Sequence, residues 1–227
     1  MEQVVASLPV TAIRRSVQKG TVLLCQGDEP NRVHFVVSGS VKVSRVGYGG
    51  EEQVVGFRTA GDLFPEPWAF GLTAITIYNY TAAELSEIAL MDKDAFEQYL
   101  VQNPSVKDTC FNHILKSYMG AMLQVTALGQ SYATDKLTMV LYYLMLKYGK
   151  EKAPGEYWVA VKLSHMVIAS LTGLSRETVT TELGRLRRKG IIEYETGKLM
   201  IRRKALTDKL NDAGFADPWL WPTEKIT

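Results

Sequence analysis

The sequence predicts an α+β protein in which a small β-barrel or sandwich is followed by a long helix and a winged helix–turn–helix. Short runs rich in β-branched residues alternate with turn residues over 18–90. Residues 104–134 carry a helical pattern with no proline after the first position. Residues 163–201 contain two capped helical segments and then a hairpin pattern. Together these three patterns indicate the order of the elements.

The composition is that of an ordinary folded protein. Of 227 residues, 46% are apolar and 22% are charged, which excludes a disordered chain, a collagen and a membrane bundle. No apolar run approaches the ~20 residues that span a bilayer, and the start lacks the pattern of a signal peptide. The two cysteines, Cys25 and Cys110, are too few for a four-thiolate iron–sulfur cluster or a cysteine-rich zinc site. We expect a cytoplasmic protein with reduced thiols and no membrane partner.

The formal net charge of +2 hides an uneven distribution of charge. Residues 1–135 contain 10 Lys+Arg and 14 Asp+Glu (net −4), and residues 211–227 contain 1 and 3 (net −2). Residues 136–210 contain 15 Lys+Arg and 7 Asp+Glu, a net charge of +8. A compact basic segment in a near-neutral chain predicts a nucleic-acid-binding face on one part of the protein.

Residues 18–90 have the spacing of a small β-domain. The apolar runs Thr21–Cys25, Val33–Val37 and Val41–Val46 are separated by the turn segments Gln26–Pro30 and Ser38–Ser40. Turn residues recur about every 8–12 positions, as in a small barrel or sandwich of short strands. This pattern predicts the N-terminal β-domain.

A short helix over 92–102 leads to a long one that begins at Pro104, since proline is tolerated in a first helical turn. Large apolar residues recur on the long helix with heptad spacing: Phe111, Leu115, Tyr118, Met122, Val125 and Tyr132. Such a seam packs against a second helix, and we expect it to form a homodimer interface. The alternative is a helix that packs only on its own β-domain. Another helix over 135–148, a polar loop over 150–156 and a short strand over 157–161 follow.

Residues 163–190 have the pattern of a helix–turn–helix. Ser164 and Ser175 are each placed to cap a helix, and Gly173 permits the positive φ of the turn between the helices. Apolar residues at i, i+4 and i+7 give the second helix a buried face: Val179, Leu183 and Leu186.

The other face of the second helix carries Arg176 and Glu177 in its first turn, where a recognition helix meets base edges. Arg176 can form two hydrogen bonds to guanine, and Glu177 can accept one from cytosine. The remaining side chains that we expect at the DNA are Ser164, Ser175, Thr178, Thr180, Thr181, Arg185 and Arg187. Residues 190–201 read as a wing with a turn at Thr196–Gly197, from which Lys198, Arg202 and Arg203 can reach phosphates. The alternative function is a ligand- or partner-sensing module whose winged helix binds protein and not DNA.

With these motifs, the chain resembles the Crp/Fnr (cAMP receptor protein/FNR) family of bacterial transcription regulators over about residues 10–210. Leu174–Val179 is similar to the family's recognition-helix signature, and Gly39–Val43 and Gly61–Asp62 lie where its β-roll has turn glycines. The resemblance implies a β-roll like a cyclic-nucleotide-binding jelly roll (1–103), a dimerisation helix (104–134), a winged helix–turn–helix (135–210) and a tail (211–227). It also implies a homodimer that binds a pseudo-palindromic operator in double-stranded DNA and contacts RNA polymerase.

The chain departs from the family's cyclic-nucleotide site. Pro65 followed by Glu66 holds the position of the phosphate-binding glycine, and residues 73–81 contain no Lys or Arg. Proline lacks a backbone N–H, and burying a phosphate without a cation is costly. We therefore expect no control by cAMP, and either no effector, with the pocket filled, or an uncharged or aromatic one. The candidate pocket residues are Phe64, Glu66, Trp68, Thr76, Ile77, Tyr78, Ala121 and Met122.

A second departure lies on the recognition helix. Members of the family that read TGTGA carry another Arg four residues after the Glu, where this chain has Thr181. Threonine cannot form the forked pair with guanine. The predicted half-site keeps a G:C pair read by Arg176 and Glu177 and differs at the neighbouring pair.

No residue pattern predicts a cofactor, a metal site or an enzyme. No Ser/His/Asp set, phosphate-binding glycine loop or pair of carboxylates stands out. We expect the histidines, His34, His113 and His165, to be structural or solvated, although His113 on the long helix is a conceivable haem ligand.

Overall fold

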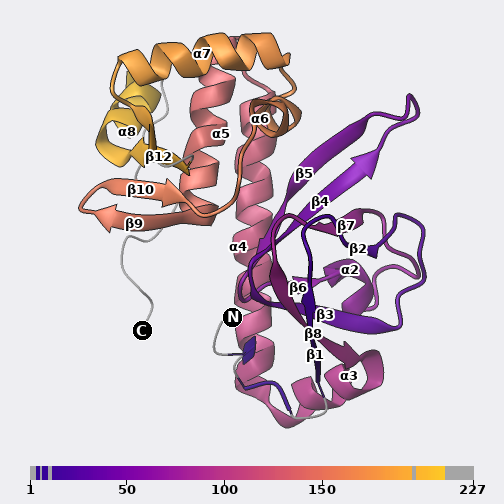
Figure 1. The fold of residues 1–227 in the computed structure, drawn as a ribbon. Helices are drawn as coiled ribbons and strands as arrows, with labels where there is room; N and C mark the ends of the chain where they lie inside the picture. The colour runs from indigo at the N-terminus through magenta and orange to yellow at the C-terminus, as the bar shows by residue number, and fades with distance from the viewer. Residues whose placement is uncertain (1–3, 6, 10–11, 196–197, 213–227) are drawn as a thin grey trace. The chain divides into compact units, whose positions relative to one another are not determined.

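The computed structural model describes residues 4–5, 7–9, 12–195 and 198–212 (Figure 1). The chain divides into two compact units, Met1–Ser117 and Tyr118–Thr227, and each has its own core. The predicted wing turn Thr196–Gly197 and most of the tail lie outside the described residues.

The first unit is built on two four-stranded sheets. One sheet has the order β1-β8-β3-β6 and the other the order β2-β7-β4-β5, with antiparallel pairing throughout. Gly39 joins β3 to β4 with a φ of +82°, and a Cβ there would lie 2.3 Å from the Ser86 hydroxyl oxygen, so this turn requires glycine. The strands are β1 (Ile13–Val17), β2 (Val22–Leu24), β3 (Arg32–Ser38), β4 (Ser40–Val46), β5 (Glu52–Thr59), β6 (Leu63–Phe64), β7 (Asn79–Ala82) and β8 (Ser86–Asp92).

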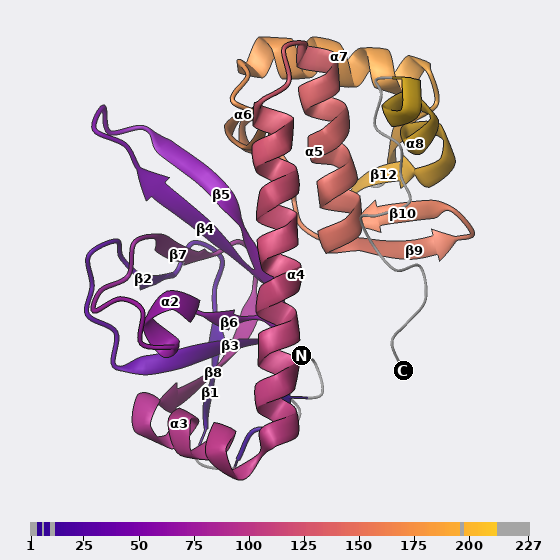
Figure 2. The same cartoon turned by 180° about the vertical axis from the view of Figure 1, so that it is seen from behind.

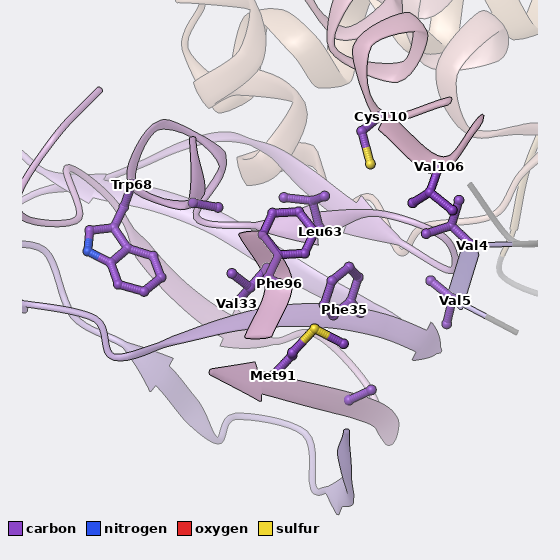
Figure 3. Packing of buried hydrophobic residues seen from close by; sticks show 12 residues of the cluster. Val4, Val5, Val33, Phe35, Leu63, Trp68, Met91, Phe96, Val106 and Cys110 are labelled. Atoms are coloured by element: carbon purple, nitrogen blue, oxygen red, sulfur yellow. The ribbon is translucent and has the colours of Figure 1, made fainter. Parts of the chain in front are cut away.

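Two clusters of buried residues form the core of this unit. The first joins strands of the first sheet to the helices α2 (Glu66–Ala69) and α3 (Lys93–Gln102) and to the start of α4 (Pro104–Leu128). Figure 3 shows Phe35 and Phe96 at its centre, with Val106 and Cys110 reaching it from α4. The second cluster contains Val36, Val41, Val43, Phe64, Tyr80 and Ile88. The predicted β-domain is therefore present, with the start of the long helix packed on it.

The long helix is shorter than predicted. It ends at Leu128 and not near residue 134, and the next residue is Gly129, a poor helix former. The next helix, α5 (Ala133–Tyr148), begins two residues before the predicted start, and Tyr132 is its N-cap residue. Tyr132 therefore stands beyond α4, and the predicted seam on α4 ends at Val125.

The second unit places α5 at the centre of its core. Leu137, Val140, Leu141 and Leu144 of α5 are all 0% exposed. Around α5 lie α6 (His165–Thr172), α7 (Arg176–Arg188) and α8 (Arg203–Asp212), as Figure 2 shows. The sheet order is β11-β12-β10-β9, with β9 (Gly149–Ala153), β10 (Glu156–Val159), β11 (Ile192–Glu195) and β12 (Lys198–Arg202).

Two segments of this unit differ from the sequence reading. Strand β9 occupies most of the predicted polar loop, because it pairs with β10 and turns at Gly155, whose φ is +77°. Helix α8, for which the sequence pattern offered no prediction, buries Leu206 and Leu210.

Candidate functional site

The helix–turn–helix has the predicted caps and turn. The Ser164 hydroxyl accepts a hydrogen bond from the Val167 amide (3.2 Å) at the start of α6. The Ser175 hydroxyl accepts one from the Thr178 amide (3.1 Å) at the start of α7. Gly173 ends α6 in the left-handed conformation, with φ at +65°. These local contacts hold the two helices at a short, defined turn.

Helix α7 has one buried face and one exposed face. Val179, Leu183 and Leu186 are 0–2% exposed and pack inward. All but one of the predicted DNA contacts on α7 are exposed: Arg176, Glu177, Thr180, Thr181, Arg185 and Arg187. Thr178 is half-buried, and its hydroxyl lies 3.0 Å from that of Ser175. The exposed face therefore presents an arginine, a carboxylate and hydroxyls on one rigid surface.

His165, which the sequence reading left without a role, links the two helices. Its Nδ1 lies 2.8 Å from the Thr180 hydroxyl oxygen, and that hydroxyl donates its own proton to the Arg176 carbonyl (2.8 Å). A hydroxyl has a single proton, so His165 Nδ1 is the donor in this contact. The bond ties the first residue of α6 to the first turns of α7.

Glu182 is a second positioning residue that the exposed-face pattern did not reveal. It lies on α7 but is 5% exposed. One carboxylate oxygen accepts a hydrogen bond from the Thr134 hydroxyl of α5 (2.6 Å), and the other pairs with Arg185. Glu182 thus anchors the recognition helix to the start of α5 and holds Arg185 on the surface.

Two cations of the wing sheet, Arg202 and Lys198, have different surroundings. Arg202, predicted to reach phosphates, pairs instead with Glu193 (2.8 Å) and Glu156 (3.3 Å) and donates to the Gly190 carbonyl (2.9 Å). Lys198 is exposed, with its Nζ 5.1 Å from the centroid of the Trp158 ring. Arg202 therefore stabilises the wing, and Lys198 remains on its surface.

The β-roll contains a mostly buried ion pair between Arg58 of β5 and Glu66, the first residue of α2. Arg58 Nε lies 2.7 Å from one Glu66 carboxylate oxygen, and Arg58 Nη2 donates to the other (3.1 Å). The two side chains are only 19% and 15% exposed. Burial alone would lower the pKa of Arg58, but the charge and hydrogen bond of Glu66 together with Tyr80 and Asp62 outweigh burial and raise that pKa. Glu66, one of the candidate pocket residues, is therefore paired within the chain.

Phe64 lies between two rings, with its centroid 4.9 Å from that of His34 and 4.8 Å from that of Tyr80. His34 is 8% exposed, and burial lowers the pKa of its imidazole to about 4. Thr76 is 1% exposed and donates to the Tyr78 carbonyl (2.9 Å). The aromatic residues of this region are packed as core.

The candidate effector-pocket residues of the first unit are divided between its two core clusters and its surface. Phe64 belongs to one core cluster and Trp68 to the other. Ile77 is 45% exposed, and Met122 of the second unit is 43% exposed. The sequence reading missed Arg58, because it lies in β5, outside the segment that was searched for a cation.

Asp62 joins the Gly61–Asp62 turn to α4. One of its carboxylate oxygens lies 2.8 Å from His113 Nε2, and the other accepts from the Thr59 amide (2.6 Å). Burial would raise the pKa of Asp62, but the hydrogen bond from His113 and the charges of His113 and Arg58 lower it below its ordinary value. Because His113 Nε2 is engaged in this pair, the histidine is placed as a structural residue.

The predicted heptad seam lies on the exposed side of α4. Its members are between 43% and 60% exposed: Phe111, Leu115, Tyr118, Met122 and Val125. The opposite side of the helix is buried at Val106, Cys110, Leu123 and Ala127. The helix therefore packs on its own chain along one side and exposes an apolar stripe along the other, and the use of that stripe as a dimer interface stays a prediction.

The described residues contain neither a candidate metal site nor a membrane-spanning helix. No group of three or more His, Cys, Asp or Glu side chains there could hold a metal ion. In the same part of the chain, every helix is too short or too polar to cross a membrane.

Comparisons with known proteins agree with this architecture. The family model for the cyclic nucleotide-binding domain matches residues 14–103, and that for the Crp-like helix-turn-helix domain matches residues 135–208. The chain is 28% identical over 193 residues to the global nitrogen regulator of Nostoc sp., covering 82% of this chain and 83% of that protein. It is 24% identical over 205 residues to the fumarate and nitrate reduction regulatory protein of Escherichia coli, covering 88% and 76%.

A solved structure of a CooA mutant from Carboxydothermus hydrogenoformans has the same fold. The TM-score is 0.72 at 21% identity, over 90% of this chain and 88% of that one. The curated relatives named above are regulators, and the two family models match the β-roll and the winged helix–turn–helix in the predicted order. These findings confirm the predicted fold class, and the chain belongs to the Crp/Fnr family of transcription regulators.

Proposed function

We propose that this regulator is a homodimer that binds a pseudo-palindromic DNA site by placing α7 in the major groove. The exposed face of α7 carries the proposal, because Arg176 and Glu177 stand in its first turn on a helix whose other face is buried. Arginine can bind guanine with two hydrogen bonds, and a carboxylate can accept from cytosine. Ser164, Ser175, Thr178 and Lys198 are assigned to the phosphates at the edges of this contact.

The apolar stripe on α4 supports the dimer. Five large apolar side chains spaced three or four residues apart stay exposed in the single chain. A second copy of the helix would cover them, because a/d residues of two helices interlock across a seam. Two copies related by a two-fold axis would present two α7 helices to half-sites about one turn of DNA apart.

We infer that cAMP does not control this protein. Arg58 is the cation that contacts the candidate pocket residue Glu66, and the carboxylate of Glu66 already binds it within the chain. A cyclic phosphate would have to displace that carboxylate and leave it without its partner in a mostly buried place, which is costly. Phe64 and Trp68 are packed in the core, so a roll that works without a small effector accounts for these residues.

Selection from a randomised duplex library tests the proposal. The purified protein, without any added effector, should enrich a two-fold symmetric site, and its affinity should fall steeply with salt as Lys and Arg displace counterions. Addition of cAMP should leave the enriched site and the affinity unchanged. Salt-sensitive binding without an enriched motif would contradict the effector-free state, and no binding at low salt would favour the protein-binding alternative.

Two variants assign the roles on α7. Arg176→Ala should weaken binding to the enriched site by about 1–3 kcal/mol and relax preference for the G:C pair. We assign Arg187, in the last turn of α7, to a phosphate. Arg187→Ala should therefore weaken binding to all sequences alike and reduce the salt dependence, since a phosphate contact carries no sequence information. Equal losses on the enriched site and on random DNA for Arg176→Ala would contradict its role in base recognition.

A further inference from the structure

Helix α7 contains one interior glycine, Gly184, in the middle of its exposed face. Seven residues separate it from Glu177, which is close to two full helical turns, so the two positions share nearly one direction. Thr181 precedes it and Arg188 follows it at spacings of three and four residues on the same side. Val179, Leu183 and Leu186 bury the opposite side. Gly184 therefore points away from the protein at the centre of the proposed DNA-binding face.

Among the residues that the structure describes, packing gives no reason for a glycine at this position. A Cβ built on Gly184 meets no atom within 4 Å. The interior glycine of α4 is different, since a Cβ on Gly120 would lie 3.0 Å from the Tyr143 ring. Glycine is the poorest helix former after proline, so Gly184 weakens α7 without any packing gain among the described residues.

A partner outside the chain, here the DNA of the proposed function, would account for the missing side chain. The major groove is about 12 Å wide, and a helix with its side chains is about 10–12 Å across, so even one added side chain affects how deeply a helix can enter. Arg188 Nε lies 3.4 Å from the Gly184 carbonyl oxygen, so the neighbouring cation folds back beside this gap. We propose that Gly184 is a positioning residue: it lets bound DNA approach the backbone of α7 more closely than any other residue would allow.

This inference rests on the proposed function, and a series of substitutions at one position tests it. Gly184→Ala should raise the melting temperature by about 2 °C, because it improves helix propensity without a clash. The same variant should weaken binding to the enriched duplex by about tenfold, a size that one misplaced base contact produces. Gly184→Leu should weaken binding further. The salt dependence should stay that of the wild type, since no charge changes.

Gln98→Ala, at an exposed position of α3 in the other unit, is the control for a neutral helix substitution and should leave DNA binding unchanged. The proposal is overturned if Gly184→Ala binds the enriched duplex as tightly as the wild type. A lower melting temperature for Gly184→Ala would also overturn it, because the reason for the glycine would then lie inside the chain. Failure of the wild type to enrich any symmetric site would instead refute the proposed function, so the two failures are distinguishable.

Discussion

Leu115→Glu tests the apolar stripe of α4 most directly. Leu115 is 44% exposed in the single chain, so nearly half of its side chain is available to a second copy. Full burial of a leucine contributes roughly 1.5–3 kcal/mol, so covering the exposed half contributes about 1 kcal/mol in each protomer. In a two-fold symmetric dimer every change occurs twice, which makes the apolar loss about 2 kcal/mol.

The introduced carboxylate adds to this loss. Two glutamates would enter an apolar seam, and each would lose solvation beside apolar neighbours. The combined effect should raise the dimer dissociation constant at least 100-fold, since 1.4 kcal/mol corresponds to a factor of ten. DNA binding should weaken with it, because a monomer contacts only one half-site.

Sedimentation velocity over a range of protein concentrations measures this constant, and circular dichroism checks that the variant is folded. Asn112→Glu is the matched control: it adds the same charge at an exposed position of α4, about 100° around the helix from the stripe. A folded Leu115→Glu variant that dimerises like the wild type would refute the reasoning. An equal loss in Asn112→Glu would refute it as well, because charge and not the stripe would then be the cause.

Three further predictions concern the buried polar groups. His34 has a pKa near 6.5 in the unfolded chain and about 4 in the native chain, so the free energy of unfolding should fall by about 3 kcal/mol as the pH drops between these values. Urea unfolding at stepped pH measures this loss. His34→Phe should remove that part of the dependence of stability on pH. Glu66→Ala should destabilise the β-roll by about 3–5 kcal/mol because Arg58 loses its partner, and the double variant Arg58→Met with Glu66→Leu should be more stable in thermal unfolding than Glu66→Ala. Glu182→Ala should cost about 1–3 kcal/mol, because Thr134 loses its acceptor, and should weaken DNA binding; unchanged binding by fluorescence anisotropy would show that Glu182 does not position α7.

The sequence by itself determined the elements that depend only on interactions between residues close together in the chain. Ser164, Gly173 and Ser175 fix the two helices and their turn through contacts that span three or four residues, and a serine cap or a positive-φ glycine is readable from position alone. The heptad spacing on α4 is also local, because it depends only on the helical repeat.

Only the tertiary structure decided which charged groups face solvent and which form ion pairs within the chain. The sequence places Glu66 among apolar residues without naming its partner, and folding brings it to Arg58 in β5. From the sequence alone, Arg202 is a candidate phosphate contact. In the fold, β10 and β11 place Glu156 and Glu193 beside it. Pairing between separate elements depends on strand register and helix packing, which no spacing along the chain encodes.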